Sequence, residues 1–220
     1  YARFLAQGAA MDPDERRGVL SRQADLLGLP LGMVERAEGR ISMHVFSREL
    51  LRDERKIVGL YDATVTAADP FPDRAAFSGP DPTLAGSTAA YTTAVNQVLR
   101  GELGVETTRD YRVLSYDVFY AWKDDVATQA FSPAQGATDD FRYGMALNPH
   151  MRAFITHGRH DMVTPYFASD RLRNLMRLDP DAGDRLRVEH FPGGHMFYAR
   201  ESSRLAFTAA VREFVAEAMR

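Results

Sequence analysis

The stretch RAFITHGRHDMVTPY, residues 152–166, carries the strongest fold signal in this sequence of 220 residues. Its first part, Arg152-Ala-Phe-Ile-Thr156, is a short apolar run that predicts a mostly buried strand, and Gly158 is expected to end it. Asp161 follows almost at once. An ionised carboxylate beside a core is costly unless a partner holds it. The partner of Asp161 is therefore the central question for both fold and function.

The residues after this stretch repeat the order strand, helix, strand, helix. A helix is expected from Pro165 with Thr164 as its cap, and residues 186–191 alternate as in a half-buried strand. The predicted inner faces are Ala168, Leu172, Leu175 and Met176 in the first helix, and Phe207, Val211, Phe214, Val215 and Ala218 in the final one. This order predicts an α/β fold with parallel strands.

The preceding sequence predicts mainly helices. Asp12 is expected to cap a helix that stops at Gly28, a second helix should follow Pro30 and end near Gly39, and Ser42 should cap a third. Residues 57–82 are rich in turn formers and predict a long connection. Further expectations are a helix over 91–99 ending at Gly101, a strand or packed loop at 111–122 and an exposed stretch at 133–140. We therefore divide the chain into a helical cap region with its connection, 1–82, and a core, 83–220.

Composition excludes several classes of function. Hydrophobic residues make up 45% and charged residues 26%, as in ordinary globular proteins, and the net charge of -3 argues against a general nucleic-acid binder. Cysteine is absent, which excludes disulfides and thiolate chemistry. No apolar run approaches the roughly 20 residues of a membrane span, so no membrane partner is expected. The sequence begins at Tyr1 rather than Met, and localisation is left open.

The strand order predicts which residue holds Asp161. Parallel strands joined by right-handed crossovers end at the same edge of a sheet, and His195 follows the second strand as Asp161 follows the first. We expect the Asp161 carboxylate to accept the Nδ1 proton of His195, which leaves Nε2 free as a base. Gly193 and Gly194 would allow the sharp turn and close approach that this contact needs. No Gly-x-Ser-x-Gly segment is present, so a triad would lack its nucleophile.

Three motifs resemble the C-terminal segments of bacterial serine carboxypeptidases, peptidase family S10. They are Asn148-Pro149-His150, Gly158-Arg-His-Asp161-Met-Val-Thr164-Pro165-Tyr166-Phe167 and Gly193-Gly194-His195-Met196-Phe-Tyr198. The resemblance implies the C-terminal part of an α/β-hydrolase fold behind a helical cap insertion, with Asp161 and His195 as triad acid and base. It also implies a peptide substrate, no cofactor, a periplasmic or secreted setting, and a nucleophilic serine in an N-terminal half upstream of Tyr1. We therefore expect this chain alone to be inactive.

Other interpretations of the same residues stay open. Asp161 could cap the following helix, His195 could be structural, and Met196 is a candidate substrate-binding residue that could equally be core. His157, His160 and His190 could ligate zinc with Asp161, but the His-x-x-His spacing does not suit one helix face, and we expect no metal. The protein could also be an esterase, an aminopeptidase or a non-catalytic binding domain on the same scaffold.

Overall fold

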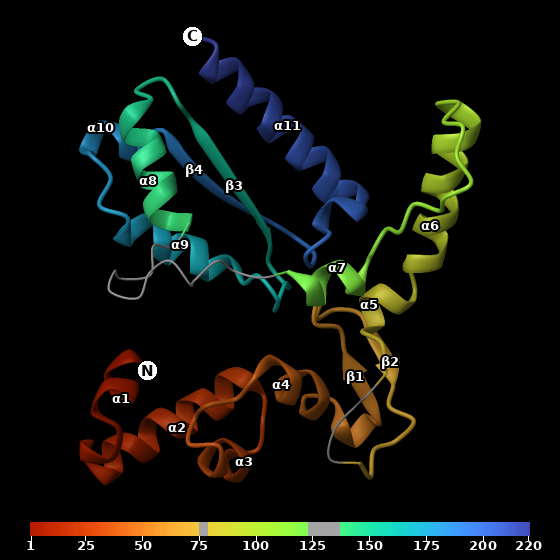
Figure 1. Cartoon of the computed structure of the whole chain (residues 1–220). Coiled ribbons are helices and arrows are strands. Elements are labelled where there is room, and N and C mark those ends of the chain that lie inside the picture. The colour runs from red at the N-terminus through yellow and green to blue at the C-terminus, as the bar shows by residue number, and fades with distance from the viewer. Residues whose placement is uncertain (75–78, 123–136) are drawn as a thin grey trace.

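The computed structural model describes residues 1–74, 79–122 and 137–220 (Figure 1). The protein is a mixed α/β protein in which helices dominate and the described strands form two small sheets. One sheet is an antiparallel pair in the first third of the chain, and the other is a parallel pair near the C-terminus. The predicted α/β class is therefore confirmed at this level.

The first four helices pack around a core of their own. They are α1 (Ala2–Gln7), α2 (Pro13–Leu27), α3 (Leu31–Arg36) and α4 (Met43–Glu49). The Asp12 carboxylate accepts hydrogen bonds from two backbone N–H groups at the start of α2, and Gly28 ends that helix in the left-handed conformation. Ser42 caps α4 as predicted. The shared core comprises Phe4, Met11, Leu20, Ala24, Leu29 and Val34.

The predicted connection at 57–82 is wrong in part, because it contains a small hairpin. After the 3-10 turn η2 (Arg52–Glu54), strand β1 (Lys56–Val58) pairs antiparallel with β2 (Thr66–Ala68). Ile57 and Val58 are buried, and the hydroxyl of Ser47 on α4 donates to the Val58 carbonyl. Strands of three residues are too short to show an alternating pattern, so tertiary contacts rather than sequence period define this hairpin.

The middle of the chain is more helical than its sequence predicts. The expected helix is present as α6 (Thr88–Gln97) and a π-helical turn, η3 (Val98–Glu102), and a short helix that was not predicted, α5 (Pro82–Ala85), precedes it. The aromatic segment at 111–122 was expected to be a strand or a packed loop. Instead, its second half forms the helix α7 (Tyr116–Ala121), which Ser115 caps. In the stretch predicted to be exposed, residues 137–140 begin α8 (Ala137–Leu147), and residues 133–136 lie outside the described residues.

The C-terminal segment has the predicted order of elements. Strand β3 (Ala153–Gly158) is followed by α9 (Tyr166–Leu175), α10 (Pro180–Gly183), β4 (Leu186–Phe191), the 3-10 turn η4 (Phe197–Ala199) and α11 (Glu201–Ala218). The two strands pair in parallel over their whole length, from Ala153 opposite Leu186 to Gly158 opposite Phe191. Their carboxyl ends therefore lie together at one edge of the sheet.

Helices cover both faces of the β3–β4 pair (Figure 1). On one face, Met145 of α8 and Met176 pack with Leu186 and Ile155. On the other face, Ala210 and Phe207 of α11 pack with Phe154, Phe191 and Phe197. Successive side chains of a strand point to opposite faces, so both sets of β4 side chains are covered. The apolar and polar side chains that alternate along residues 186–191 therefore do not mark one buried face and one solvent-exposed face, as a half-buried strand would require.

Five local predictions in this segment are wrong, and two of them are Ala168 and Ala218, which were expected on inner helix faces but are exposed. Pro165 occupies the cap position of α9 without a side-chain cap, and the Thr164 hydroxyl bonds to Asp161 instead. Leu175 is 61% exposed because it lies one residue, about 100° of helix, from the inward-facing Met176. Val215 is 46% exposed, whereas α11 packs inward through Phe207 and Ala210.

The proposed division at residue 82 stays a prediction, but contacts cross it. The loop between β1 and β2, residues 59–65, hydrogen-bonds to residues that follow β3 and β4. Among the helices that the structure describes, none is long and apolar enough to cross a membrane.

Candidate active site

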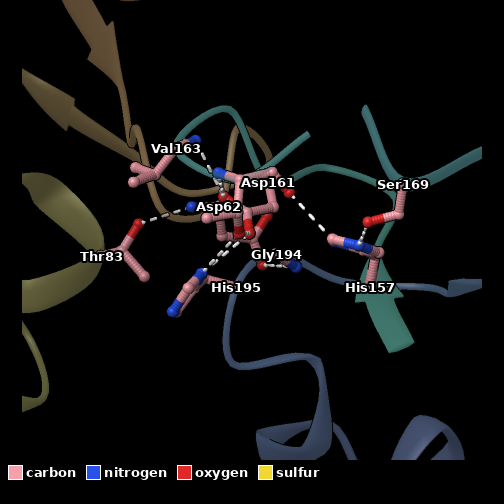
Figure 2. A network of polar contacts seen from close by, with 9 residues as sticks. Asp62, Thr83, His157, Asp161, Val163, Ser169, Gly194 and His195 are labelled. Carbon is pink, nitrogen blue, oxygen red and sulfur yellow. Dashed lines mark hydrogen bonds and ion pairs between the residues drawn. The ribbon is translucent and has the colours of Figure 1, made fainter. Parts of the chain in front are cut away.

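The structure brings Asp161 and His195 together at the carboxyl edge of the parallel pair, as the strand order predicts. Asp161 Oδ2 lies 2.8 Å from His195 Nδ1, although the residues are 34 positions apart in sequence (Figure 2). The carboxylate is buried, whereas 42% of the imidazole side chain is exposed. A buried acceptor therefore holds one ring nitrogen while part of the ring faces outward.

The Asp161 carboxylate is fully supplied with hydrogen-bond donors. Oδ1 accepts from the backbone N–H groups of Val163 at 2.9 Å and Thr164 at 3.0 Å, and Oδ2 accepts from the Thr164 hydroxyl and from His195. The two backbone bonds form a local turn of the kind that the helix-cap interpretation expected. The same carboxylate thus orders its own loop and binds the imidazole.

These contacts fix the tautomer of the neutral imidazole. A carboxylate only accepts hydrogen bonds, so His195 Nδ1 carries the proton and Nε2 keeps its lone pair. In the part of the chain that the structure describes, no residue forms a hydrogen bond with Nε2. The geometry is that of a general base oriented by a buried acid.

A third loop, which the sequence did not reveal, brackets both residues. This hairpin loop, residues 59–65, accepts from Met162 N–H through the Leu60 carbonyl at 3.0 Å. It also accepts from His195 N–H through the Tyr61 carbonyl at 2.6 Å, and the Tyr61 ring meets the imidazole edge-on at 5.4 Å. Burial, with nearby Tyr116 and acidic groups, raises the pKa of Tyr61 and keeps its hydroxyl protonated.

Asp62 is the charged group of the hairpin loop. Its Oδ2 accepts from Gly194 N–H at 3.1 Å (Figure 2) and from the Arg200 guanidinium at 2.9 Å. Its Oδ1 accepts from the backbone N–H and the hydroxyl of Thr64. Burial by itself would raise the pKa of Asp62, but the hydrogen bonds from Thr64 and Arg200 together outweigh it, and the pKa is lowered. Asp62 is therefore an ionised carboxylate directly behind the His195 loop.

Glycines permit the close approach of the three loops. A Cβ atom on Gly158 would lie 1.8 Å from the Gly194 carbonyl oxygen, and one on Gly194 would lie 2.0 Å from the Tyr61 carbonyl oxygen. Gly193 has a φ of 122°, which side chains rarely adopt. Gly193 thus supplies the turn, while Gly194 supplies the space in which backbone meets backbone.

Sequence reasoning missed Asp62, Thr64 and Arg200. Asp62 follows a strand of only three residues, and its partners Gly194 and Arg200 are 132 and 138 positions away. The local signal in the sequence is the turn pattern Gly-x-x-Asp-x-Thr at residues 59–64. Such patterns are common in surface turns, so this one does not indicate a functional site.

The histidines considered for zinc do not converge on Asp161. His157 Nδ1 faces the Thr164 carbonyl at 3.1 Å, its Nε2 faces the Ser169 hydroxyl at 2.7 Å, and His190 Nε2 lies 3.1 Å from Asp170. Over residues 1–74, 79–122 and 137–220, no group of three or more histidine or acidic side chains is arranged to hold a metal ion. The zinc interpretation is therefore not supported by the arrangement of these residues.

His157 and Ser169 form a serine–histidine pair separate from the Asp161–His195 pair (Figure 2). A carbonyl oxygen only accepts, so His157 Nδ1 carries the proton and Nε2 accepts from the Ser169 hydroxyl. Ser169 lies on helix α9, and the orienting group is a backbone carbonyl rather than a buried carboxylate.

The imidazole of the Asp161–His195 pair is part-exposed, whereas its carboxylate is buried. A cavity of about 860 Å³ lies apart from the pair, between α8 and the residues Arg177, Leu178, Asp179 and Ala182. Met196 is half-buried and directly follows His195, and its role in substrate binding stays a prediction. Comparison of the chain with protein-family models, with curated proteins and with solved structures gives no match.

Proposed function

We propose that this chain carries the acid and base of a serine carboxypeptidase-like hydrolase of the α/β-hydrolase class, with Asp161 as acid and His195 as base. The observation that carries the proposal is the 2.8 Å contact between the buried Asp161 carboxylate and Nδ1 of a part-exposed imidazole at the carboxyl edge of a parallel sheet. The motifs around both residues support the carboxypeptidase assignment.

The nucleophile in this proposal is a serine on a segment upstream of Tyr1. Its hydroxyl attacks the carbonyl carbon of the last peptide bond while His195 Nε2 takes the hydroxyl proton. The imidazolium then gives that proton to the leaving amine, and water releases the acyl group by the same route in reverse. Asp161 stays ionised and stabilises the imidazolium, because its second oxygen is held by the backbone N–H groups of Val163 and Thr164.

The exposure of the His195 imidazole is consistent with a nucleophile that lies on another segment. The described residues supply a base and its orienting acid, and 42% of the base's side chain is exposed. A hydrolase of this class also needs donors for the oxyanion and walls for the substrate. The proposal places these groups on the upstream segment.

The test compares this chain with the longer product of the same reading frame. We expect the longer protein to cleave a blocked dipeptide at its C-terminal bond and to react with a fluorophosphonate probe, and this chain alone to do neither. Asp161→Asn should lower kcat by about 10⁴-fold, and His195→Gln by about 10⁶-fold. His190→Gln is the control, because His190 lies 3.1 Å from Asp170 without a hydrogen bond and away from the site, and the variant should retain activity.

Three outcomes would contradict the proposal. A longer product that contains no probe-reactive serine points to a binding domain. Cleavage of esters without cleavage of the blocked dipeptide points to an esterase on the same scaffold. Full activity in the Asp161→Asn variant would show that the Asp161–His195 pair is not needed for catalysis.

The Ser169–His157 pair supports a second candidate, in which this chain is itself a hydrolase. The 2.7 Å contact favours it, because a serine within reach of an oriented histidine is the minimum nucleophilic unit. In this case the chain alone would react with the probe, and Ser169→Ala would abolish the reaction while His195→Gln would not.

A further inference from the structure

The backbone on the N-terminal side of His195 is held by two consecutive hydrogen bonds from one loop. Gly194 N–H donates to Asp62 Oδ2 at 3.1 Å, and His195 N–H donates to the Tyr61 carbonyl at 2.6 Å. Both acceptors belong to the hairpin loop, which lies more than 130 residues away in sequence. The direction in which the imidazole leaves the backbone is therefore set by this loop.

Asp62 also forms an ion pair with the chain on the C-terminal side of His195. The same Oδ2 that receives Gly194 N–H receives the Arg200 guanidinium at 2.9 Å, just before helix α11 begins. Arg200 donates in addition to the Thr64 hydroxyl, which itself donates to Asp62 Oδ1 at 2.6 Å. One carboxylate thus ties together both ends of the segment 194–200 that carries His195.

We propose that Asp62, clamped by Arg200, is a positioning residue that keeps the His195 imidazole on Asp161. Its catalytic purpose rests on the proposed function, but the placement of the ring is measurable without any activity. The hydrogen bonds of the Asp62 carboxylate go to Gly194, Arg200 and Thr64, whereas the imidazole bonds to Asp161, so Asp62 acts through the Gly194–His195 backbone.

The negative charge of Asp62 is required because every group around the carboxylate is a donor. The side chain is 11% exposed, and its two oxygens accept from Gly194, Arg200 and Thr64. An asparagine has the same shape but only one oxygen, so its NH₂ group must face donors on one side or the other. Asp62→Asn therefore breaks the clamp with little change in volume.

The test is the tautomer of His195 in this chain, read from its ring nitrogen chemical shifts at about pH 9, where histidine is neutral. His195→Gln assigns the signals. We expect the Nδ1–H form to dominate in the native chain, and its ratio to the Nε2–H form to fall by about tenfold in Asp62→Asn, the order expected for loss of a charge-assisted hydrogen bond to Asp161. Asp69→Asn is the matched control, since Asp69 is a buried carboxylate that pairs with a different arginine, Arg48.

Arg200 provides the second pair of variants, because its side chain is 42% exposed and its replacement is mild. Arg200→Met should lower the tautomer ratio, whereas Arg200→Lys, which keeps the charge, should restore much of it. The proposal is overturned if Asp62→Asn leaves the ratio unchanged, if Asp69→Asn lowers it equally, or if Arg200→Met and Arg200→Lys behave alike. The tautomer ratio is measured without peptidase activity. It therefore tests the positioning role of Asp62 even if the protein proves not to be a peptidase.

Discussion

Gly194→Ala is the sharpest steric test of how the three loops meet. A Cβ atom at Gly194 would lie 2.0 Å from the Tyr61 carbonyl oxygen and 2.5 Å from the Cα atom of Asp62. Both contacts are with backbone, which cannot rotate away as a side chain does. Real Cβ contacts are essentially never shorter than 3.0 Å, so the hairpin loop must retreat by about 1 Å.

The expected cost follows from this displacement. Overpacking in a tight site typically costs about 1–3 kcal/mol. The retreat also weakens the hydrogen bonds from Gly194 N–H to Asp62 and from His195 N–H to the Tyr61 carbonyl, each of which contributes about 1 kcal/mol. We therefore expect the free energy of unfolding to fall by about 3–5 kcal/mol, and Tm to fall by about 10 °C in a protein of this size.

The assay is urea unfolding followed by circular dichroism, with Gly18→Ala as the control. Gly18 lies inside helix α2, and a Cβ atom there meets no described atom within 4 Å. Alanine should stabilise that helix by about 0.5–1 kcal/mol. The reasoning is refuted if Gly194→Ala unfolds within about 0.5 kcal/mol of the native chain, the ordinary range for a surface substitution.

Three further predictions concern charge and hydrogen bonding. The folded-state pKa of Asp62 is lowered, so its stabilisation is complete above the unfolded-state value of 3.8 and is lost as the pH falls through the lower folded-state value. Acid titration of the free energy of unfolding should consequently be less steep below about pH 4 in Asp62→Asn than in the native chain; equal slopes would contradict this. Arg48→Met should cost about 3–5 kcal/mol in urea unfolding, because it leaves the Asp69 carboxylate buried and unpaired; the double change with Asp69→Leu should recover most of that loss, and no recovery would count against the pairing. Thr164→Val should increase the amide hydrogen exchange of the 161–164 turn, since its hydroxyl bonds to the Asp161 carboxylate; unchanged exchange would show that the hydroxyl is dispensable.

Much of the site could be predicted because its two central residues obey a rule of chain topology. Asp161 and His195 each follow a strand, and parallel strands end at one edge, so their meeting required only the order of elements. The supporting residues obey no such rule. Asp62 lies in a loop between strands of three residues, and nothing in its neighbourhood indicates that Gly194 and Arg200 will be its partners.

The helical errors have a different cause. The aromatic residues of 116–121 favour a strand by intrinsic preference, yet the segment forms α7 from the Ser115 cap. Threonine is a residue type that often caps helices, but the hydroxyl of Thr164 bonds to the buried Asp161 carboxylate instead of to the backbone of α9. Local preference is weak, and a buried charge outweighs it where the two conflict.

The mixed α/β class, the parallel pair of strands and the edge at which a carboxylate would meet an imidazole could all be predicted from the amino-acid sequence. These features depend on apolar periodicity and on glycine and proline positions, which act over a few residues. Three features became visible in the folded chain alone: the hairpin loop brackets the pair, Asp62 and Arg200 clamp the His195 segment, and Gly194 lies close against the backbone of the hairpin loop. Those contacts join residues more than 130 positions apart, and they are fixed by packing and by the need to satisfy a buried charge rather than by any local pattern.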